Sequence, residues 1–184
     1  MVEHNGYNPL FVPKSHRITI TNKTNTRWLP VVGNRLYRAI ANLNEVVNFV
    51  KKTYPHIPVN VIEWHKVPFP EQIAMMLNTT IFITPCGGAS MIAPFLPHGA
   101  SAIIMDYYVS KVDIFHFKKG ASASMDGFFH NHFPHFRKIY YQVYGPQDYV
   151  FDYEGATNTR DDASILVNLT RLHLLMETAM DWRF

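Results

Sequence analysis

A short glycine-containing turn is the strongest candidate for chemistry in this 184-residue chain. It reads Thr-Pro-Cys-Gly-Gly-Ala-Ser over residues 84–90 and directly follows an apolar run. Two adjacent glycines let backbone N–H groups approach an anion closely, and a helix over residues 89–93 would add the favourable end of its dipole. Pro94 limits that helix to about one turn. On spacing alone the pattern favours a plain tight turn, with a phosphate-binding turn as the alternative interpretation.

Several charged side chains follow predicted strands and could assist such a site. Asp106 follows the run 101–105, where a carboxylate can accept hydrogen bonds from the vicinal hydroxyls of a ribose. Lys23, Arg35 and Arg38 follow the first predicted strand, and arginine can bind phosphate oxygens through two parallel hydrogen bonds. Asp106 is equally compatible with an exposed aspartate at a strand end, whereas for each of the three cations taken alone a solvated surface position is favoured.

Histidines and the single cysteine suggest two other chemistries. His130, His132 and His135 lie close in sequence, but their spacing beside Pro134 matches no standard zinc pattern, so packing or surface roles are favoured. Cys86 at a helix N-terminus would be a nucleophile if its thiol pKa were lowered. Because no histidine accompanies it at a characteristic spacing, the sequence favours neither a metal site nor cysteine-based catalysis.

The order of apolar runs and helical stretches predicts an α/β fold built on a parallel sheet. Strands are expected at 17–22, 59–63, 81–84, 101–105 and 139–144. Helices are expected over 42–54, from Pro70 onward, and over 161–180. Parallel strands need crossover connections, and their buried strands are continuous apolar runs. The order therefore predicts a Rossmann-like sheet flanked by helices, which is half of a doubly wound fold.

Helix starts and connections can also be predicted. Pro70 is tolerated in a first turn, and Glu71 and Gln72 most simply supply the start of that helix. Asp161 or Asp162 lies near the expected cap of the last helix. Its apolar stripe would comprise Ile165, Leu166, Leu169, Leu172 and Met176. A polar loop that carries Lys23, Arg27 and Arg35 is expected after the first strand.

Composition limits the classes of function. The formal net charge is +3, and the longest basic runs are pairs of lysines, so nucleic acid is not an expected partner. No apolar stretch approaches the ~18 residues of a spanning helix, and no signal peptide is recognisable, so we expect a soluble chain without a membrane segment. One cysteine excludes an intrachain disulfide, which fits the cytoplasm but leaves the secretory lumen open. The length predicts one domain over 17–184 after an irregular lead-in over 1–16.

Three segments that occur in order resemble glycosyltransferase family 61. Phe69-Pro70-Glu71-Gln72-Ile73 resembles its Glu-Gln helix start, residues 81–89 its apolar strand ending in a His-Gly-Ala type turn, and residues 95–99 its Phe-Leu-Pro-x-Gly segment. Upstream, residues 38–42 with Asn44-Glu45 resemble the family's Arg-x-Ile-x-Asn helix start. The resemblance extends over about residues 17–107.

This resemblance implies a GT-B architecture with two Rossmann-like halves, of which this chain would be the C-terminal, donor-binding half. It implies an inverting, metal-independent enzyme that takes a nucleotide sugar, such as a UDP-sugar, as co-substrate and needs no further cofactor. The partners would be that donor, a hydroxyl of a glycan or protein acceptor, and an N-terminal acceptor domain for which the chain has little room. The alternative is a non-catalytic Rossmann-like module derived from such an enzyme.

The resemblance also implies roles for individual residues. The donor- and phosphate-binding set would be Lys23, Arg38, Pro85, Cys86, Gly87, Gly88, Ala89 and Ser90. Asp106 would bind the ribose, with Glu71 and Gln72 in support. Cys86 stands where the family has histidine and Ile92 where it has asparagine, which indicates either a different donor preference or lost activity. The sequence identifies no general base.

Overall fold

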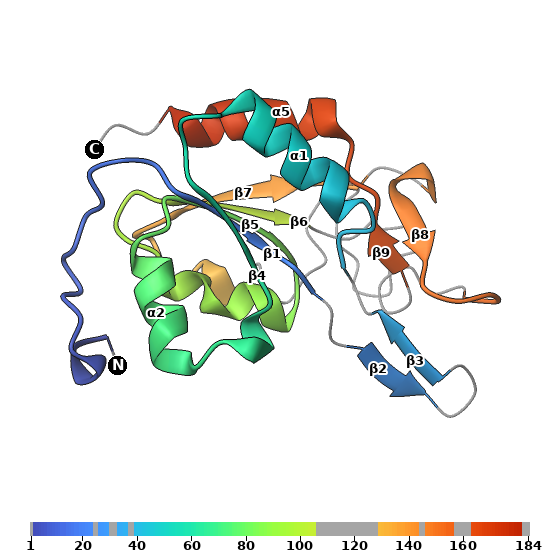
Figure 1. The fold of residues 1–184 in the computed structure, drawn as a ribbon, viewed down its shortest axis with the longest axis horizontal. Helices are drawn as coiled ribbons and strands as arrows, with labels where there is room; N and C mark the ends of the chain where they lie inside the picture. The colour runs from blue at the N-terminus through green and yellow to red at the C-terminus, as the bar shows by residue number, and fades with distance from the viewer. Residues whose placement is uncertain are drawn as a thin grey trace.

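A five-stranded parallel sheet is the centre of the described structure (Figure 1). The computed structural model describes residues 2–23, 26–29, 33–36, 39–105, 129–143, 146–156 and 163–181. In spatial order the strands are β4 (Val59–Ile62), β1 (Ile18–Thr21), β5 (Ile81–Pro85), β6 (Ser101–Met105) and β7 (Arg137–Tyr141). All neighbouring strands in this sheet run parallel. The predicted α/β class with a Rossmann-like parallel sheet is confirmed.

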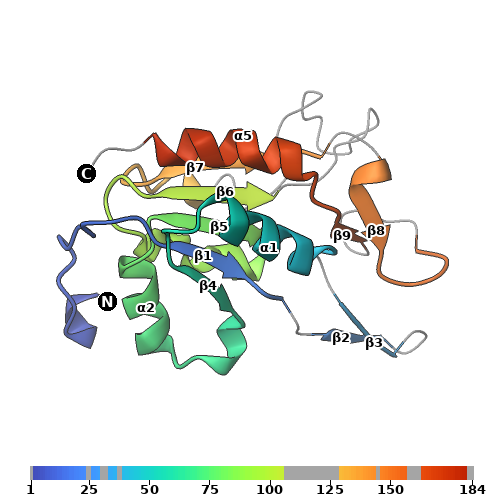
Figure 2. The ribbon, with the colours of Figure 1, turned by 45° about the horizontal axis from the view of Figure 1, so that its top comes forward.

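Helices cover both faces of the sheet (Figures 1 and 2). On one face lie α1 (Leu43–Thr53) and α5 (Leu169–Met180). On the other lie α2 (Phe69–Leu77) and the 3-10 helix η3 (Gly88–Phe95). The crossovers from β1 to β4 and from β4 to β5 pass over opposite faces, as a doubly wound sheet requires.

The strands supply alternate side chains to two buried layers. Ile103 and Met105 of β6 pack in the cluster under α1 and α5, whereas Ile104 packs in the cluster under α2 and η3. The same alternation separates Ile83 from Phe82 in β5. A strand that is apolar on both faces must lie inside the sheet, which explains why these runs are continuously hydrophobic.

Local signals set the helix boundaries near the centre of the chain. In α1, Val46 and Val50 are one turn apart and fully buried, and the chain turns away at Pro55 after the helix ends. In α2, Pro70 lies in the first turn, where its missing N–H costs nothing, and Glu71 follows it. These helices therefore agree with the prediction to within a residue or two.

The last helix is shorter than predicted. It begins at Leu169, and its N-cap is Asn168, whose side chain accepts a hydrogen bond from the Arg171 N–H at 3.0 Å. Residues Ala163–Ile165 form strand β9, which pairs antiparallel with β8 (Tyr149–Phe151). The prediction of a helix over 161–180 is therefore wrong in its first part. Residues 163–165 pair with β8, and this pairing overrides the helix-like spacing of their apolar side chains. Asp161 and Asp162 lie outside the described residues.

Three further details differ from the sequence-based prediction. The expected polar loop contains an antiparallel hairpin of β2 (Thr26–Leu29) and β3 (Gly33–Leu36). The strand predicted at 139–144 runs from Arg137 to Tyr141, because it pairs along the whole of β6. The helix after the glycine turn is a 3-10 helix over Gly88–Phe95 that contains Pro94, so it is longer than the single turn expected before Pro94. Within the described part of the chain, no helix has the length and apolar character that a bilayer crossing requires.

Candidate functional site

The glycine turn lies at the topological switch point of the sheet. Counted along the chain, the five strands have the spatial order 2-1-3-4-5. The connection that leaves β1 leads to one side and the connection that leaves β5 leads to the other, and in open α/β sheets a crevice forms outside the carboxyl ends of two such strands. Lys23 follows β1, and residues 86–88 follow β5, at this same edge. Ligands of open α/β sheets bind in such crevices.

The turn itself is built by backbone bonds that leave one glycine open. Cys86 donates its N–H to the Met105 carbonyl oxygen at 3.0 Å, which extends the pairing of β5 with β6. Gly87 has φ 102° and is buried, and its carbonyl accepts both the N–H and the hydroxyl of Ser90 at 2.9 Å. Gly88 is exposed, and a Cβ added to it would meet no atom within 4 Å. The turn therefore leaves Gly88 open to solvent, while Ser90 holds the shape of the turn.

A buried hydrogen-bond chain supports the turn from below. The Trp64 indole N–H donates to the Thr21 hydroxyl at 3.0 Å, and Thr21 donates to the Thr84 hydroxyl at 3.0 Å. Thr84 in turn donates to the Pro85 carbonyl oxygen at 3.0 Å. These hydrogen bonds connect the carboxyl ends of β1 and β5 to the loop after β4. Trp64 and Thr21 were not singled out from the sequence, because threonines at strand ends are common and the partners are distant along the sequence.

A hollow of about 440 Å³ lies beside the end of β1. Asn22 and Lys23 form one wall, and residues 39–45, which include the start of α1, form the other. Asn42 fixes this helix start, because its amide group donates to the Val167 carbonyl and accepts from the Val167 N–H. Lys23 and the first turn of this 11-residue helix favour an anion here, whereas Glu45, which lies in that turn and lines the hollow, opposes it.

Gly88 lines a larger pocket of about 600 Å³, which we call the aromatic pocket. Its aromatic lining residues are Trp64, Phe69, Phe95, Phe129 and Phe133, and Gly88, Ala89 and Gln72 also line it. Gln72 donates its two amide hydrogens to the carbonyl oxygens of Trp64 and Val67, each at 2.8 Å. Gln72 therefore holds the loop that carries Trp64, whereas Glu71 is exposed.

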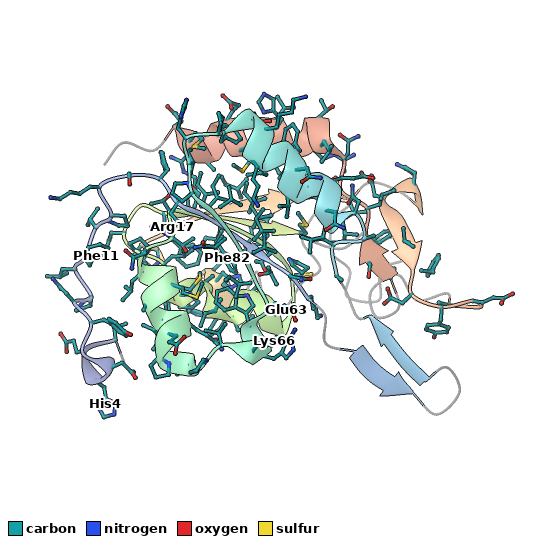
Figure 3. All side chains as sticks on the ribbon, in the orientation of Figure 1. His4, Phe11, Arg17, Glu63, Lys66 and Phe82 are labelled. Carbon is teal, nitrogen blue, oxygen red and sulfur yellow. The ribbon has the colours of Figure 1, made fainter. Side chains whose placement is uncertain are left out.

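The loop after β4 carries a surface ion pair next to this pocket. Figure 3 shows Glu63 and Lys66 beside each other on that loop, and their charged groups are 2.6 Å apart. The same figure shows Phe82 on the α2 side of the sheet, where its ring meets the Trp64 ring at 5.9 Å in an edge-to-face contact. The pair helps to shape the loop, but its exposure limits its contribution to stability.

At the far end of the sheet, Arg171 joins β7 to α5. Its guanidinium donates to the Gln142 carbonyl at 2.9 Å and to the Asp148 carboxylate at 3.3 Å. The Tyr141 hydroxyl accepts the Asn168 N–H at 2.8 Å, and burial raises the pKa of this tyrosine. These bonds explain how the start of α5 is fixed, and we assign them a structural role.

The three clustered histidines take separate positions around η3. His130 is buried and hydrogen-bonded to the Ser90 carbonyl at 3.1 Å, and His135 is bonded to the Pro94 carbonyl at 3.1 Å. His132 is exposed. Burial lowers the pKa of His135. Among the described residues, no group of three or more His, Cys, Asp or Glu side chains is arranged to hold a metal ion.

The structure places most of the predicted site residues around the glycine turn. Residues 85–87 and Ser90 are buried and shape the turn, and Cys86 packs in the cluster under α2 and η3. Gly88 is exposed, Ala89 is half-buried, and Lys23 lies on the neighbouring strand end. Arg38 and Asp106 lie outside the described residues. Which of these side chains contact a ligand stays a prediction.

The Glycosyltransferase 61 family model matches residues 5–104, which is more than half of the chain. The chain belongs to glycosyltransferase family 61. The match includes the sheet from β1 to β6, the α2 helix start and the glycine turn, so the resemblance drawn from these segments is confirmed. It ends before Asp106. A comparison with curated proteins found no match for this family 61 chain.

Proposed function

We propose that this chain binds a nucleotide-sugar donor at the crevice between the carboxyl ends of β1 and β5 and serves as the donor-binding domain of a glycosyltransferase. The observation that carries the proposal is the exposed, unobstructed Gly88 at the switch point of the sheet. Family membership supports the reaction class. The position of the glycine turn at the switch point supports the location proposed for the donor.

In this proposal the donor diphosphate lies over Gly88 and Ala89, whose backbone N–H groups are the available donors. Lys23 and the first turn of α1 contribute positive potential from the neighbouring strand. Arg38 would add a second cation and Asp106 would bind the ribose hydroxyls. The buried members of the turn, Pro85, Cys86, Gly87 and Ser90, act by holding the backbone in shape.

The reaction we propose is an inverting, metal-independent transfer of the sugar to a hydroxyl of a glycan or glycoprotein. The bond from the anomeric carbon to the diphosphate oxygen breaks, and the diphosphate keeps the electron pair. The acceptor oxygen bonds to that carbon from the opposite side and loses its proton to a general base. Backbone N–H groups and cations stabilise the departing diphosphate, which is the task that a metal-free site must perform.

One feature favours a second candidate, a binding module without catalysis. Cys86 stands where the family carries histidine, and its thiol is fully buried in an apolar cluster. A neutral, buried thiol is a weak hydrogen-bond donor and cannot supply the charge of an imidazolium. Such a domain would bind a nucleotide diphosphate but release no sugar from it.

Calorimetric titration of the chain with UDP, GDP and their sugars tests the proposal. We expect saturable binding of at least one nucleotide diphosphate. The substitution Gly88→Asp should weaken it about tenfold or more, because the added carboxylate faces the phosphates. Ser15→Asp adds the same charge in an exposed segment before the amino end of β1 and should leave binding unchanged.

The same titrations separate the alternatives. Absence of binding by every nucleotide in a folded chain, or equal binding by the Gly88→Asp variant, would contradict the proposed site. Binding without release of nucleoside diphosphate from any sugar donor, in the presence of acceptor glycans, would favour the non-catalytic module.

A further inference from the structure

The aromatic pocket borders the glycine turn, and the proposed donor site leaves it unused. Its lining runs from Gly88 and Ala89 along η3 to α2, the loop after β4 and the segment before β7, and Val2 also contributes. Phe69 is 45% exposed and Phe129 is 38% exposed, so both present apolar surface to solvent. Exposed aromatic side chains gathered around a concave space are typical of a binding site.

The walls of the aromatic pocket are held in place before any ligand binds. Trp64 is fixed by its hydrogen bond to Thr21 and by its edge contact with Phe82. Phe69 meets Phe95 with ring centroids 5.8 Å apart, and the two helices α2 and η3 that carry them pack together. Because little side-chain freedom is lost on binding, a pre-formed pocket of this kind favours affinity.

The chemistry of the walls selects a neutral, apolar group. None of the described residues that line the pocket has a charged side chain. Gln72 is the only described lining residue with an amide side chain, and it already donates both amide hydrogens to backbone carbonyls. Away from the backbone of Gly88 and Ala89, a phosphate, a carboxylate or the hydroxyls of a sugar ring would lose hydration here without compensating bonds. An aromatic or aliphatic group would gain from the transfer.

We propose that the aromatic pocket binds the aromatic or apolar aglycone of the acceptor. This inference rests on the proposed function, because Gly88 borders both the pocket and the proposed diphosphate site. An aglycone that fills the pocket would place the rest of the acceptor beside the bound donor. The acceptor class is thus a hydroxyl-bearing glycoside or alcohol with a hydrophobic substituent.

The test compares phenyl β-glucoside with methyl β-glucoside, which differ only in the aglycone, by saturation-transfer NMR and calorimetry on the full chain with and without UDP or GDP. We expect the phenyl glucoside to bind about tenfold more tightly, because the apolar surface of its phenyl ring is transferred from water into the pocket. Phe69→Ala should bring the two affinities close together. Phe151→Ala is the matched control, since Phe151 is 43% exposed on β8 and does not line the pocket.

Phe129→Ala, in the opposite wall, provides a second pocket variant, and far-UV circular dichroism confirms the folding of each protein. Equal affinities for the two glucosides, or an unchanged preference in both pocket variants, overturn the inference. If nucleotides bind while the phenyl preference is absent, the inference falls and the proposed function stands. If the phenyl preference is present but no nucleotide binds, the acceptor assignment falls together with the proposed function.

Discussion

Gly87 and Gly88 are adjacent, but the backbone places different demands on them. Gly87 has φ 102° and ψ −159°, a conformation that a Cβ disfavours, whereas Gly88 lies outside the left-handed region and faces open space. Gly87→Ala should therefore lower the free energy of unfolding by about 1–3 kcal/mol. Gly88→Ala should change it by no more than about 0.5 kcal/mol. Urea unfolding of the two variants measures both, and equal losses would show that the turn is not shaped as described.

Thr21 is the central member of the hydrogen-bond chain below the turn. Its hydroxyl accepts from Trp64 and donates to Thr84, and the side chain is 1% exposed. Thr21→Val keeps the shape but leaves those groups without their partner, so we expect a loss of about 1–3 kcal/mol in the free energy of unfolding. Thr21→Ser should retain most of the stability. Thr170→Val, on the exposed side of α5, is the control and should lower the free energy of unfolding by less than about 0.5 kcal/mol. An equal loss in the Thr170 and Thr21 variants would refute the role assigned to the Thr21 hydroxyl.

At this scale the sequence predicts residue types better than contacts. The glycine pair was recognisable because adjacent glycines after an apolar strand are unusual and carry a physical meaning. The series of hydrogen bonds from Trp64 to Thr21 and Thr84 was not recognisable, because it joins residues that are 43 and 63 positions apart in the sequence. Only the register of β1 against β4 and β5 brings them together, and no local pattern encodes that register.

The start of α5 depends on one cap. Asn168 accepts the Arg171 N–H at 3.0 Å, so Asn168→Ala should lower the free energy of unfolding by about 1 kcal/mol. Asn168→Asp keeps an accepting oxygen at the cap and should remain close to the parent protein. Thermal and urea unfolding give the comparison. Equal stability of the alanine and aspartate variants would mean that tertiary packing alone sets the helix boundary.

The strands of the parallel sheet were predictable, and the small strands outside it were not. The inner strands β1, β5 and β6 are buried along their whole length, and burial on both faces leaves no other place for them. The segment Ala163–Ile165 continues the apolar period of the following helix, so the sequence pattern extends the helix through it. Pairing with β8 decides its structure, and that pairing is a long-range contact.

His135 links the segment before β7 to η3 and predicts a pH effect. Burial lowers its pKa below the ordinary value of 6.5, and the neighbouring His98 and Lys138 act in the same direction, while its bond to the Pro94 carbonyl opposes them. The unfolded chain therefore binds the proton more tightly than the folded chain. This contribution to stability is present above pH ~6.5 and is lost as the pH falls below that value.

The free energy of unfolding measured at pH ~7.5 and ~5.5 tests this sign. We expect the parent protein to lose stability at the lower pH and the His135→Gln variant to lose less. His16, whose pKa burial also lowers, should account for part of the loss that remains in the variant. A larger loss in the variant than in the parent would show the sign to be wrong.

For the whole molecule, the strand order determines where the glycine turn lies, whereas the packing of side chains from several elements forms the aromatic pocket. The sequence order predicted a parallel sheet and therefore loops gathered at one edge, which is where the glycine turn lies. The aromatic pocket combines residues from the loop after β4, α2, η3 and the segment before β7. Those aromatic residues look like ordinary core candidates in sequence, because their partial exposure depends on how α2 and η3 pack together.

The two hydrophobic layers share one sheet, which predicts a single cooperative unfolding transition. Ile103 and Ile104 are neighbours in β6 and fully buried, yet they belong to opposite layers. Ile103→Val and Ile104→Val should each lower the free energy of unfolding by about 0.5–1.5 kcal/mol. Because unfolding either layer exposes the other face of the same strands, each variant should shift one common transition.

Calorimetry and far-UV circular dichroism check this expectation, since agreement of the calorimetric and van't Hoff enthalpies indicates two-state behaviour. The double variant should lose about the sum of the two single losses, to within about 0.5 kcal/mol, because the side chains do not share a layer. A second transition that only one of the substitutions moves would show that the layers unfold separately. The packing of the layer under α1 and α5 would then not affect the stability of the opposite layer, which carries the glycine turn and the aromatic pocket.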